Sequence, residues 1–506
     1  MKRIVICCDG TWNTPGESDA GVPVPTNVVR LFNAVAEVDA QGTEQLKYYH
    51  PGVGTDGSWW DKLSGGSTGR GLDRNIMSAY RYLCDHYSPD DAIFLFGFSR
   101  GAYTVRSLGG LIAHCGLLRT ADLTHAEAWR RIEQVFEQGY RRGSEKREHW
   151  ESRGWAFHNR LGTVVNIRFL GVWDTVGALG IPNDMAVLKL LDSLHDYTFH
   201  DTVLGESVET ARHAVALDEI RASFQPTLWS AKDGADALQM WFPGVHSDVG
   251  GGYRETGLSD GALTWMIDEA SKCGLAFHER MLDQIKPNYL DTLHDSCTGL
   301  FSLFPTQPRS APRLMEGNGV HKSALDRLAD PPISQCPYRI EREIGDLASA
   351  KFEIFAMQQW NPTGLWLEAG RTYVFEASGE WMDGTVKCGP EGTDDGHFQP
   401  GELLQAAGSV WGKVEQAWKK VTGNQAADFR LTKRHEHMPW FSLVGSIANG
   451  SGVDKKDRLE PHESFLIGTG CEYTPRKPGY FYAYANDAWN CYSNNRGKVE
   501  LTVTRR

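Results

Sequence analysis

Short apolar runs alternate with helical patterns along the first part of the chain. Apolar runs bounded by glycine or polar residues predict strands over 3–8, 46–50, 93–96, 166–173 and 238–245. Between them, apolar side chains recur every three or four residues and predict helices over 26–38, 71–87 and 102–113. Strands that alternate with helices are typical of a mostly parallel sheet covered on both faces. The sequence therefore predicts an α/β fold for this part.

The pattern changes near residue 345. From Phe352 onward, apolar and polar residues alternate with period two between glycine turns, which is typical of antiparallel strands. The runs cover 371–377, 439–447, 464–469, 479–486 and 498–504. We therefore predict an α/β domain over 1–345 and a C-terminal all-β sandwich over 346–506.

Three segments interrupt these patterns. Residues 118–160 are helical and charged, and 278–340 are irregular and contain prolines. Either segment is a candidate lid over a site, and a solvated surface element is an equal alternative. Residues 401–437 interrupt the β domain with a helical, Lys/Arg-rich stretch, expected to be a packed insertion or a partner contact.

Charge and hydropathy narrow the function classes. The formal net charge of −12 opposes sequence-blind binding to nucleic acid, whose phosphates need a basic face. No run approaches the roughly 18 consecutive apolar residues of a membrane-spanning helix. The apolar stretch Ile4-Val5-Ile6 is too short for the core of a signal peptide. We expect a protein made in the cytoplasm without a cleavable signal, which is secreted or injected if it acts outside the cell.

Ser99 is the candidate nucleophile. It lies in Gly97-Phe98-Ser99-Arg100-Gly101, a G-x-S-x-G pattern that also occurs around Ser67 and Ser259. Of the three serines, Ser99 alone follows an apolar strand and precedes a helix. That arrangement places a serine on a sharp, exposed turn, and the helix start favours developing negative charge.

A serine nucleophile needs a base and a carboxylate that orients the base. Asp174 follows the strand 166–173, and His246 follows the strand 238–245 at the start of a glycine-rich loop. The chain order serine, acid, histidine is typical of serine hydrolases that are built on an α/β sheet. Asp218 and Asp248 are competing acids, although Asp248 is too close in sequence to orient His246 easily and is better explained as a loop cap.

An oxyanion hole needs two backbone donors. The N–H of Arg100 is one candidate, and Gly10 or Thr11 in the loop after the first strand is the other. That loop also resembles the start of an aspartyl-phosphate phosphatase, D-x-D-G-T. The nucleophilic aspartate of such enzymes is replaced here by Cys7, which argues against phosphatase chemistry.

Four motifs carry a family resemblance: CCDGTWN (7–13), GFSRGAYTVR (97–106), GVWDTVGALG (171–180) and PGVHSDVGGGY (243–253). Together they resemble the hydrolase domain of the type VI secretion lipase effectors, over roughly residues 1–340. The resemblance implies an α/β-hydrolase fold, phospholipase A-type hydrolysis of acyl esters, and Ser99, Asp174 and His246 as the triad. It implies no cofactor for catalysis, and secretion-apparatus and immunity proteins as partners.

The C-terminal part is similar to the small calcium-dependent galactose-binding bacterial lectins, chiefly in YANDAWNCYSNNRGKVELTV (484–503). In that family, one aspartate and two adjacent asparagines bind Ca²⁺, and sugar hydroxyls complete the coordination. The matching metal positions are Asp487, Asn494 and Asn495. For a galactose-type glycan the matching positions are Asp487, Asn494 and His397. Cys491 replaces the threonine of the family's loop, and Asp383 falls near the tyrosine that donates a carbonyl.

Three functions remain open from the sequence. The first is a serine hydrolase of phospholipids at a membrane surface, directed to its target by the β domain. The second is a carboxylesterase that acts on a non-lipid ester. The third is a carbohydrate-binding protein whose hydrolase domain is inert.

Overall fold

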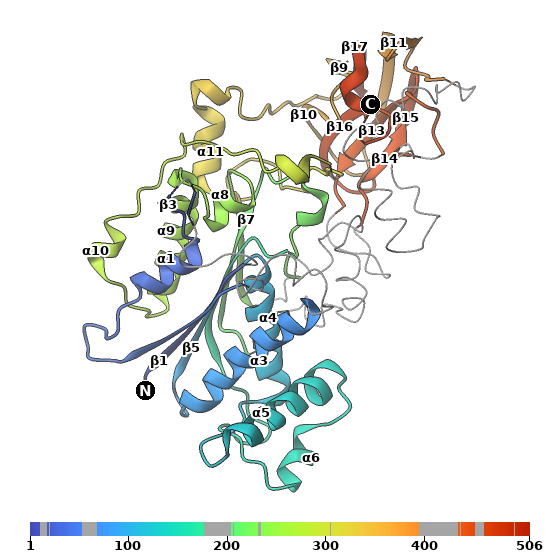
Figure 1. Cartoon of the computed structure of the whole chain (residues 1–506). Coiled ribbons are helices and arrows are strands. Elements are labelled where there is room, and N and C mark those ends of the chain that lie inside the picture. Colours follow the sequence, from blue (N-terminus) through green and yellow to red (C-terminus); the bar gives the residue numbers. More distant parts are fainter. Residues whose placement is uncertain are drawn as a thin grey trace.

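A computed structural model describes residues 1–10, 18–19, 21–52, 68–176, 204–205, 207–230, 234–303, 305–393, 434–435, 437–450, 460–489 and 491–506. The N-terminal part consists of a parallel sheet between helices, and the C-terminal part consists of antiparallel sheets (Figure 1). The predicted fold class, α/β followed by all-β, is confirmed.

The central sheet has six described strands in the order β4-β1-β5-β6-β7-β8, and every neighbouring pair is parallel. Their bounds are β1 (Arg3–Cys8), β4 (Gln45–His50), β5 (Ala92–Phe98), β6 (Ile167–Trp173), β7 (Thr210–Ala216) and β8 (Asp236–Phe242). Strand order reverses between β1 and β5, so the loops that follow these two strands diverge to opposite faces. In open α/β sheets, ligands bind at such a reversal, at the carboxyl ends of the strands.

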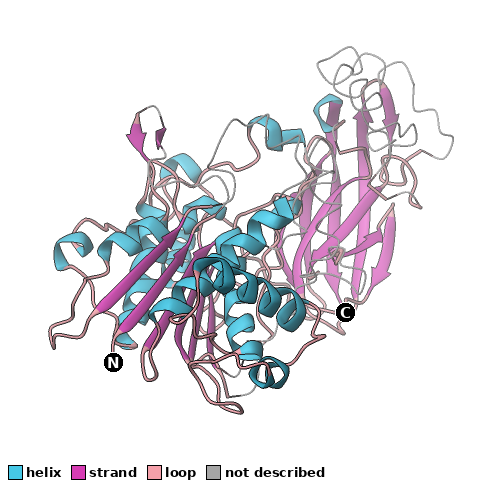
Figure 2. Ribbon diagram, turned by 60° about the horizontal axis from the view of Figure 1, so that its bottom comes forward, coloured by secondary structure: helices cyan, strands magenta, loops and turns pink. Residues whose placement is uncertain are grey.

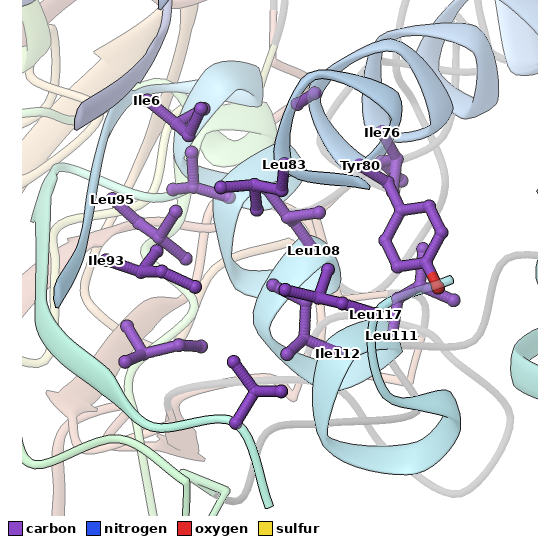
Figure 3. Packing of buried hydrophobic residues seen from close by; sticks show 14 of the residues in the cluster. Ile6, Ile76, Tyr80, Leu83, Ile93, Leu95, Leu108, Leu111, Ile112 and Leu117 are labelled. Carbon is purple, nitrogen blue, oxygen red and sulfur yellow. The ribbon is translucent and has the colours of Figure 1, made fainter. Parts of the chain in front are cut away.

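Alternate residues of the strands enter two separate cores. Ile4 and Ile6 of β1 pack on one face, and Val5 and Cys7 pack on the other. Because successive side chains of a strand point to opposite faces, a doubly covered strand has to be apolar throughout. Figure 3 shows the first core, where strand residues such as Ile6 and Leu95 face Leu83, Leu108 and other helical residues.

Helices cover both faces of the sheet. The helices α3 (Thr68–His86) and α4 (Arg100–Cys115) lie on one face, while α1 (Asn27–Ala34) and α9 (Gly257–Lys272) lie on the other (Figure 1). A two-strand ribbon, β2 (Ser18–Asp19) and β3 (Val22–Pro23), precedes α1. Among the described residues, no helix combines the length and apolar character that crossing a bilayer requires.

Strand β7 is absent from the sequence prediction. Its sequence TARHAVA contains Arg212 and His213, which break the apolar run although every residue of the strand is buried. Arg212 forms ion pairs with Asp236 and Glu269, and His213 accepts a hydrogen bond from a backbone N–H. The strand therefore buries polar groups that have partners, which an apolar pattern does not reveal.

The segment 118–160, a candidate lid in the sequence, lies at the far end of α4 from Ser99. It contains α5 (His125–Gln134), a π-helical turn (Val135–Arg141) and α6 (Arg147–Ser152). Trp150 of α6 is fully buried in the first core. Cys115, which the segment contacts, lies about 22 Å along the helix from its first turn. The described helices of the segment therefore pack near the far end of α4, while Arg141 extends back to Asp73 near the start of α3.

The segment 278–340 is irregular, as predicted, and contains the short helices α10 (Glu279–Leu282) and α11 (Lys322–Ala329). Part of it runs between the parallel sheet and the C-terminal part. Ala311, Leu314 and Val320 of this segment share a small core with Trp241 near the end of β8 and with Tyr480 of the C-terminal part.

The C-terminal part has two antiparallel sheets (Figure 2). One contains β10 (Asn361–Leu367), β16 (Gly479–Ala485), β13 (Leu443–Ala448) and β14 (Glu463–Leu466). The other contains β12 (Val386–Cys388), β11 (Tyr373–Asp383), β17 (Asn495–Arg505), β9 (Ser349–Phe355) and β15 (Gly470–Tyr473). Aromatic and aliphatic side chains of both sheets form one core, in which Trp381 is fully buried. Most of the predicted insertion 401–437 lies outside the described residues.

Candidate active site

Ser99 is held in a strained turn between β5 and α4. Its φ of 56° and ψ of −122° lie in a region that residues with a Cβ rarely adopt. The turn requires glycine on both sides. A Cβ on Gly97 would lie 2.4 Å from the carbonyl oxygen of Gly101, and one on Gly101 would lie 2.1 Å from that of Cys8. The local sequence therefore forces the serine onto the carboxyl edge of the sheet.

The other two serines in G-x-S-x-G patterns differ from Ser99. Ser259 lies in the first turn of α9, where its hydroxyl donates to the carbonyl oxygen of Thr256. Its place is a helix start rather than a turn that follows a strand. Ser67 lies outside the described residues.

His246 and Asp174 are in direct contact although 72 residues separate them. His246 begins α8 (His246–Gly250) after β8, and Asp174 follows β6. The Nδ1 of His246 lies 2.6 Å from Oδ2 of Asp174. Because an ionised carboxylate only accepts hydrogen bonds, Nδ1 carries the proton and Nε2 is left available as a base.

Two contacts bring Ser99 next to this pair. The N–H of Ser99 donates to the carbonyl oxygen of Trp173, the residue before Asp174, over 3.1 Å. The ring of Phe98 lies against the ring of His246, with 4.5 Å between centroids. Within the described residues, no hydrogen bond closes the step from the Ser99 hydroxyl to His246. Such bonds often form only when substrate is bound.

Arg309 is a member of this cluster that the sequence did not predict. Its Nη1 and Nη2 donate to the two carboxylate oxygens of Asp174 over 2.6 and 2.8 Å. The N–H of Ala216 adds a further bond to Oδ1 of Asp174. Both charged side chains are completely buried. Arg309 and Arg313 both follow prolines in the irregular segment, and nothing in the sequence separates the buried one from the more exposed one.

Burial and neighbouring charges shift the pKa values of both Asp174 and His246. Desolvation would raise the pKa of Asp174, but the charge and hydrogen bonds of Arg309, with those of His246, hold it well below its ordinary value. Burial lowers the pKa of His246, although its hydrogen bond to Asp174 opposes that shift. At neutral pH the arrangement is therefore a carboxylate beside a neutral imidazole, which is the state a general base requires.

A second buried network holds the backbone of His246. Glu219 is fully buried and accepts the N–H of His246 over 3.2 Å. Arg221 donates two hydrogen bonds to the same carboxylate. The guanidinium of Arg221 also covers the ring of Phe224, which packs edge-on against His246. These residues fix both the backbone and the ring of His246.

His213, on the unpredicted strand β7, supports the turn that carries Asp174. Its Nε2 accepts the N–H of Thr175 over 3.1 Å. Desolvation lowers the pKa of His213 to about 3, so the ring is neutral and can accept this bond. Asp174 itself has a φ of 36°, a backbone conformation that needs such support.

The competing acids have other partners. Asp248 accepts the N–H of Val245, at the start of α8, and bonds to the ring of His294 over 2.6 Å. Asp218 pairs with Arg339 and accepts the hydroxyl of Tyr338. Neither carboxylate bonds to His246, whose ring bonds to Asp174.

The three candidate donors of the oxyanion hole, Arg100, Gly10 and Thr11, differ in their surroundings. Arg100 begins the sixteen-residue helix α4, so its backbone N–H lies at the positive end of the helix dipole. The N–H of Gly10 donates to Oδ1 of Asp9 over 2.7 Å. Thr11 lies outside the described residues.

A polar cluster in the C-terminal part contains the predicted metal residues. The amide nitrogen of Asn495 donates to Asp487, and that of Asn494 donates to Asp383, each over 2.8 Å. The amide oxygens of both asparagines are buried and have no hydrogen-bond partner among the described residues. Burial, together with the neighbouring charge of Asp383, raises the pKa of Asp487 to about 6.

This donor set fits a hard cation, because it offers carboxylate and amide oxygens only. Buried oxygens without partners are the expected mark of a ligand site. The described residues contain no group of three or more His, Cys, Asp or Glu side chains placed to hold a metal. The two asparagines would therefore have to contribute. His397, the other predicted glycan residue, lies outside the described residues.

A cavity of about 580 Å³ lies elsewhere, where the irregular segment meets the C-terminal part. Thr306 and Gln307 line one side, and Trp360, His462 and Trp489 are among the residues that line the other. Ser99, Asp174 and His246 are not among its lining residues, so this cavity is separate from the candidate catalytic cluster.

Comparison with known families identifies the hydrolase part. Residues 2–269 match the family described as "T6SS, Phospholipase effector Tle1-like, catalytic domain". The chain belongs to this family. The match includes Ser99, Asp174 and His246 and confirms the resemblance to type VI secretion lipase effectors. The Tle1-like region ends before Arg309 and before the β-sandwich.

Individual relatives of the Tle1-like chain are distant. The uncharacterized protein YEL023C of Saccharomyces cerevisiae is 31% identical over 242 residues, 44% of this chain and 32% of that protein. This chain therefore spans about a third of the length of that relative. An uncharacterized Pseudomonas aeruginosa structure is 20% identical and covers 57% of this chain and 49% of its own, with a TM-score of 0.34.

Two further solved structures are also similar to this chain. The Tle1 effector bound to the VgrG spike from the type 6 secretion system is 22% identical, with 50% of this chain and 51% of that chain covered and a TM-score of 0.28. The PllA-like lectin of the EclA N-terminal domain is 15% identical, with 31% of this chain and 95% of its own covered and a TM-score of 0.19.

Proposed function

We propose that this chain hydrolyses carboxylic ester bonds of phospholipids, with Ser99 as nucleophile, His246 as general base and Asp174 as the orienting acid. The observation that carries the proposal is the 2.6 Å contact between His246 and Asp174 at the carboxyl edge of the sheet that also holds Ser99 in a strained turn. Membership of a phospholipase effector family supports the substrate class.

The reaction takes two steps. Nε2 of His246 accepts the hydroxyl proton of Ser99 while the serine oxygen bonds to the ester carbonyl carbon. The proton then passes to the leaving alcohol as the ester C–O bond breaks, which leaves an acyl-serine. Water attacks this intermediate, gives its proton to His246, and releases the fatty acid as Ser99 regains its proton. Asp174 stays ionised throughout and stabilises the imidazolium, and no cofactor enters these steps.

The tetrahedral oxyanion needs backbone donors. We assign one to the N–H of Arg100, at the start of α4. The second belongs to the loop after β1, with Gly10 or Thr11 as the donor. If Gly10 takes this role, its N–H has to leave Oδ1 of Asp9.

The decisive experiment is product analysis on a defined phosphatidylcholine with wild type beside Ser99→Ala. We expect release of free fatty acid by wild type and a loss of roughly 10⁴-fold or more in Ser99→Ala. Ser259→Ala is the matched control, because it removes a serine from the same sequence pattern on a helix start. Normal turnover by folded Ser99→Ala would disprove the assignment.

A carboxylesterase acting on a non-lipid ester is the second candidate, since the same triad serves both. Phospholipid vesicles and a short-chain water-soluble ester separate the two. A preference for vesicles in kcat/KM supports the phospholipase. Hydrolysis of the soluble ester alone would show an esterase.

For the β-sandwich we propose a calcium-dependent glycan-binding role that brings the hydrolase to a target surface. Asp487, Asn494 and Asn495 would hold the cation, with Asp383 beside them. The support is the pair of buried amide oxygens that lack a partner in the part of the chain that the structure describes, and the raised pKa of Asp487. Bound calcium would supply positive charge and open positions for vicinal sugar hydroxyls. Asp487, Asn494 and His397 are the proposed sugar contacts.

This role is tested without catalysis. Titration of Ser99→Ala with a galactoside in calcium, and again in a chelator, should show binding only with calcium. Binding in both conditions or in neither would disprove a calcium-dependent site. Glycan binding by a wild type that hydrolyses none of the esters would instead favour a carbohydrate-binding protein with an inert hydrolase domain.

We also propose delivery by a type VI secretion apparatus into a target cell, with an immunity protein that protects the producing cell. The support is the family together with a relative that was solved bound to a VgrG spike. Co-purification with the spike protein of the same organism tests the delivery route. The effect on a target cell is tested by its growth, which should stop with the wild type and continue with Ser99→Ala.

A further inference from the structure

Residues 305–314, here called the strap, run between the two parts of the molecule. On the hydrolase side the strap pairs with residues 220–222. Thr306 bridges to Arg221, the N–H of Gln307 donates to the carbonyl oxygen of Ile220, and the N–H of Ala222 donates to that of Pro305. The paired residues 220–222 directly follow Glu219 in the chain. The strap therefore lies beside the residue whose carboxylate holds the backbone of His246.

The opposite side of the strap is bonded to the β-sandwich. His462 bonds through Nε2 to the carbonyl oxygen of Pro308 over 2.6 Å, while its Nδ1 accepts the N–H of Gly450. Because Nδ1 is the acceptor, Nε2 carries the proton and donates. The hydroxyl of Ser310 donates to the carbonyl oxygen of Gly450 over 2.7 Å. The residues on both sides of Arg309 are therefore tied to the sandwich.

Between these ties, Arg309 points into the hydrolase. Besides Asp174, its guanidinium donates to the carbonyl oxygens of Ala216, at the end of β7, and Phe224. The side chain is fully buried, so its charge is compensated mainly by the Asp174 carboxylate. Its place in the cluster depends on the path of the strap.

We propose that Arg309 is a positioning residue for Asp174 and that the β-sandwich keeps it in place through the strap, which makes the sandwich a structural part of the active site. The proposal rests on the triad proposed above. A two-point contact from a planar guanidinium fixes the plane of the carboxylate. The carboxylate plane in turn sets the direction of the bond to His246.

Arg309 also sets the charge that His246 experiences. The charged or titratable groups that surround the His246 ring and its partner are Asp174, Glu219, Arg221, Arg309 and His213. Glu219 is balanced by Arg221, and Asp174 is balanced by Arg309. Loss of Arg309 leaves the negative charge of Asp174 unbalanced beside His246, which stabilises the imidazolium and raises the pKa of His246.

The first test uses a short-chain soluble ester, so that neither vesicle nor glycan binding affects the rate. In full-length Arg309→Gln we expect kcat to fall roughly 10²-fold. We expect the acidic limb of the pH–kcat profile to move up by about one pH unit. Arg309→Lys keeps the charge but loses the two-point contact, so its limb should stay near that of wild type while kcat is only partly recovered.

Arg327→Gln is the matched control. Arg327 is also fully buried, but it bonds to Tyr289, Asp291 and Gln335, away from the triad. The variant Arg327→Gln should leave the acidic limb of the pH–kcat profile at the pH of the wild type. A folded Arg309→Gln with the limb and kcat of wild type would overturn the positioning role. If Arg309→Gln does not fold, the kcat of Arg309→Lys and the strap variants described next decide, and a wild-type kcat in Arg309→Lys would overturn the positioning role.

The second test loosens the strap from the sandwich. His462→Phe and Ser310→Ala remove the two ties that flank Arg309, while Arg309 and the triad are unchanged. The bonds of Thr306 to Gln359 and Trp360, and of Leu314 to Tyr480, are kept. We expect kcat on the soluble ester to fall by about 3- to 10-fold for each, with KM little changed and the limb displaced upward. Ser464→Ala is the control, because it removes a hydrogen bond to Ser446 in the same sandwich without touching the strap.

Wild-type kcat and an unchanged acidic limb in both folded strap variants would overturn the proposal that the sandwich keeps Arg309 in place through the ties beside it. These outcomes are distinct from a failure of the proposed function, which Ser99→Ala reports by itself. If Ser99→Ala is active, the triad is wrong; if it is inactive while Arg309→Gln behaves as wild type, only the positioning role is wrong.

Discussion

Two buried aspartates in this molecule titrate in opposite directions. In the hydrolase part, the pKa of Asp174 is held well below its ordinary value by Arg309 and His246 in spite of full burial. In the β-sandwich, burial raises the pKa of Asp487 to about 6, and the neighbouring Arg434 offsets only part of the shift. Both carboxylates lie just after a strand, and both are surrounded by polar groups.

The difference lies in what balances the charge. Asp174 has a guanidinium of its own chain on both carboxylate oxygens. Asp487 accepts hydrogen bonds from an amide and from a backbone N–H, and it lies beside a second carboxylate. A buried acid whose positive partner is built in is ready for catalysis, whereas one beside a further acid and unpaired amide oxygens suits a cation taken from solution.

The largest expected effect comes from removing the charge of Asp174. Asp174→Asn should lower kcat on either ester roughly 10³- to 10⁴-fold, because the tautomer of His246 is no longer fixed. It should also lower the free energy of unfolding by about 3–5 kcal/mol, since Arg309 is left buried without a counter-charge. Urea unfolding and initial rates measure the two losses.

The double variant Asp174→Asn/Arg309→Gln sharpens this prediction. Removal of both charges should recover most of the lost stability and none of the lost activity. Equal instability of the single and double variants would contradict an ion pair at this site.

For the sandwich, calcium should do what Arg309 does for Asp174. At a free calcium concentration of about 100 times Kd, the free energy of unfolding should rise by about 2.7 kcal/mol. Asp487→Asn should abolish this gain. Glu500→Gln, which removes an exposed carboxylate of the same sandwich, should keep it. Thermal unfolding with calcium and with a chelator measures the effect, and an equal shift in Asp487→Asn would exclude a cation at Asp487.

The smallest expected effect is the pH dependence of the metal-free protein. A carboxyl whose pKa is raised from 3.8 to about 6 binds its proton more tightly in the folded state. Its favourable contribution is therefore complete below pH 3.8 and is lost as the pH rises through about 6. In chelator, Asp487→Asn should gain about 1–3 kcal/mol on wild type across this range. Parallel stability curves of the two proteins from pH 4 to 8 would disagree with the raised pKa.

The sequence predicted the parts of the site that follow strand ends. Ser99, Asp174 and His246 come directly after apolar runs, and parallel strands bring such positions to one edge. The structure places the His246–Asp174 contact and the strained turn of Ser99 there. The roles of these residues stay predictions until activity is measured.

The sequence did not predict groups whose position depends on distant chain segments. Strand β7 is hidden because Arg212 and His213 find partners only after folding. Arg309 is hidden because its partner, Asp174, lies 135 residues earlier in the chain. Asp383 reaches Asn494 only through the pairing of β11 with β17. In each case the local pattern is that of an ordinary polar surface.

The position of Arg309 in the chain has a consequence for how this protein can be divided. The match to the family model ends at residue 269, before the guanidinium that balances Asp174. A fragment cut at that border would enclose a negative charge without its counter-ion, however well its sheet assembled. If the proposed triad is correct, the shortest active fragment of this chain has to extend past residue 269 and include Arg309.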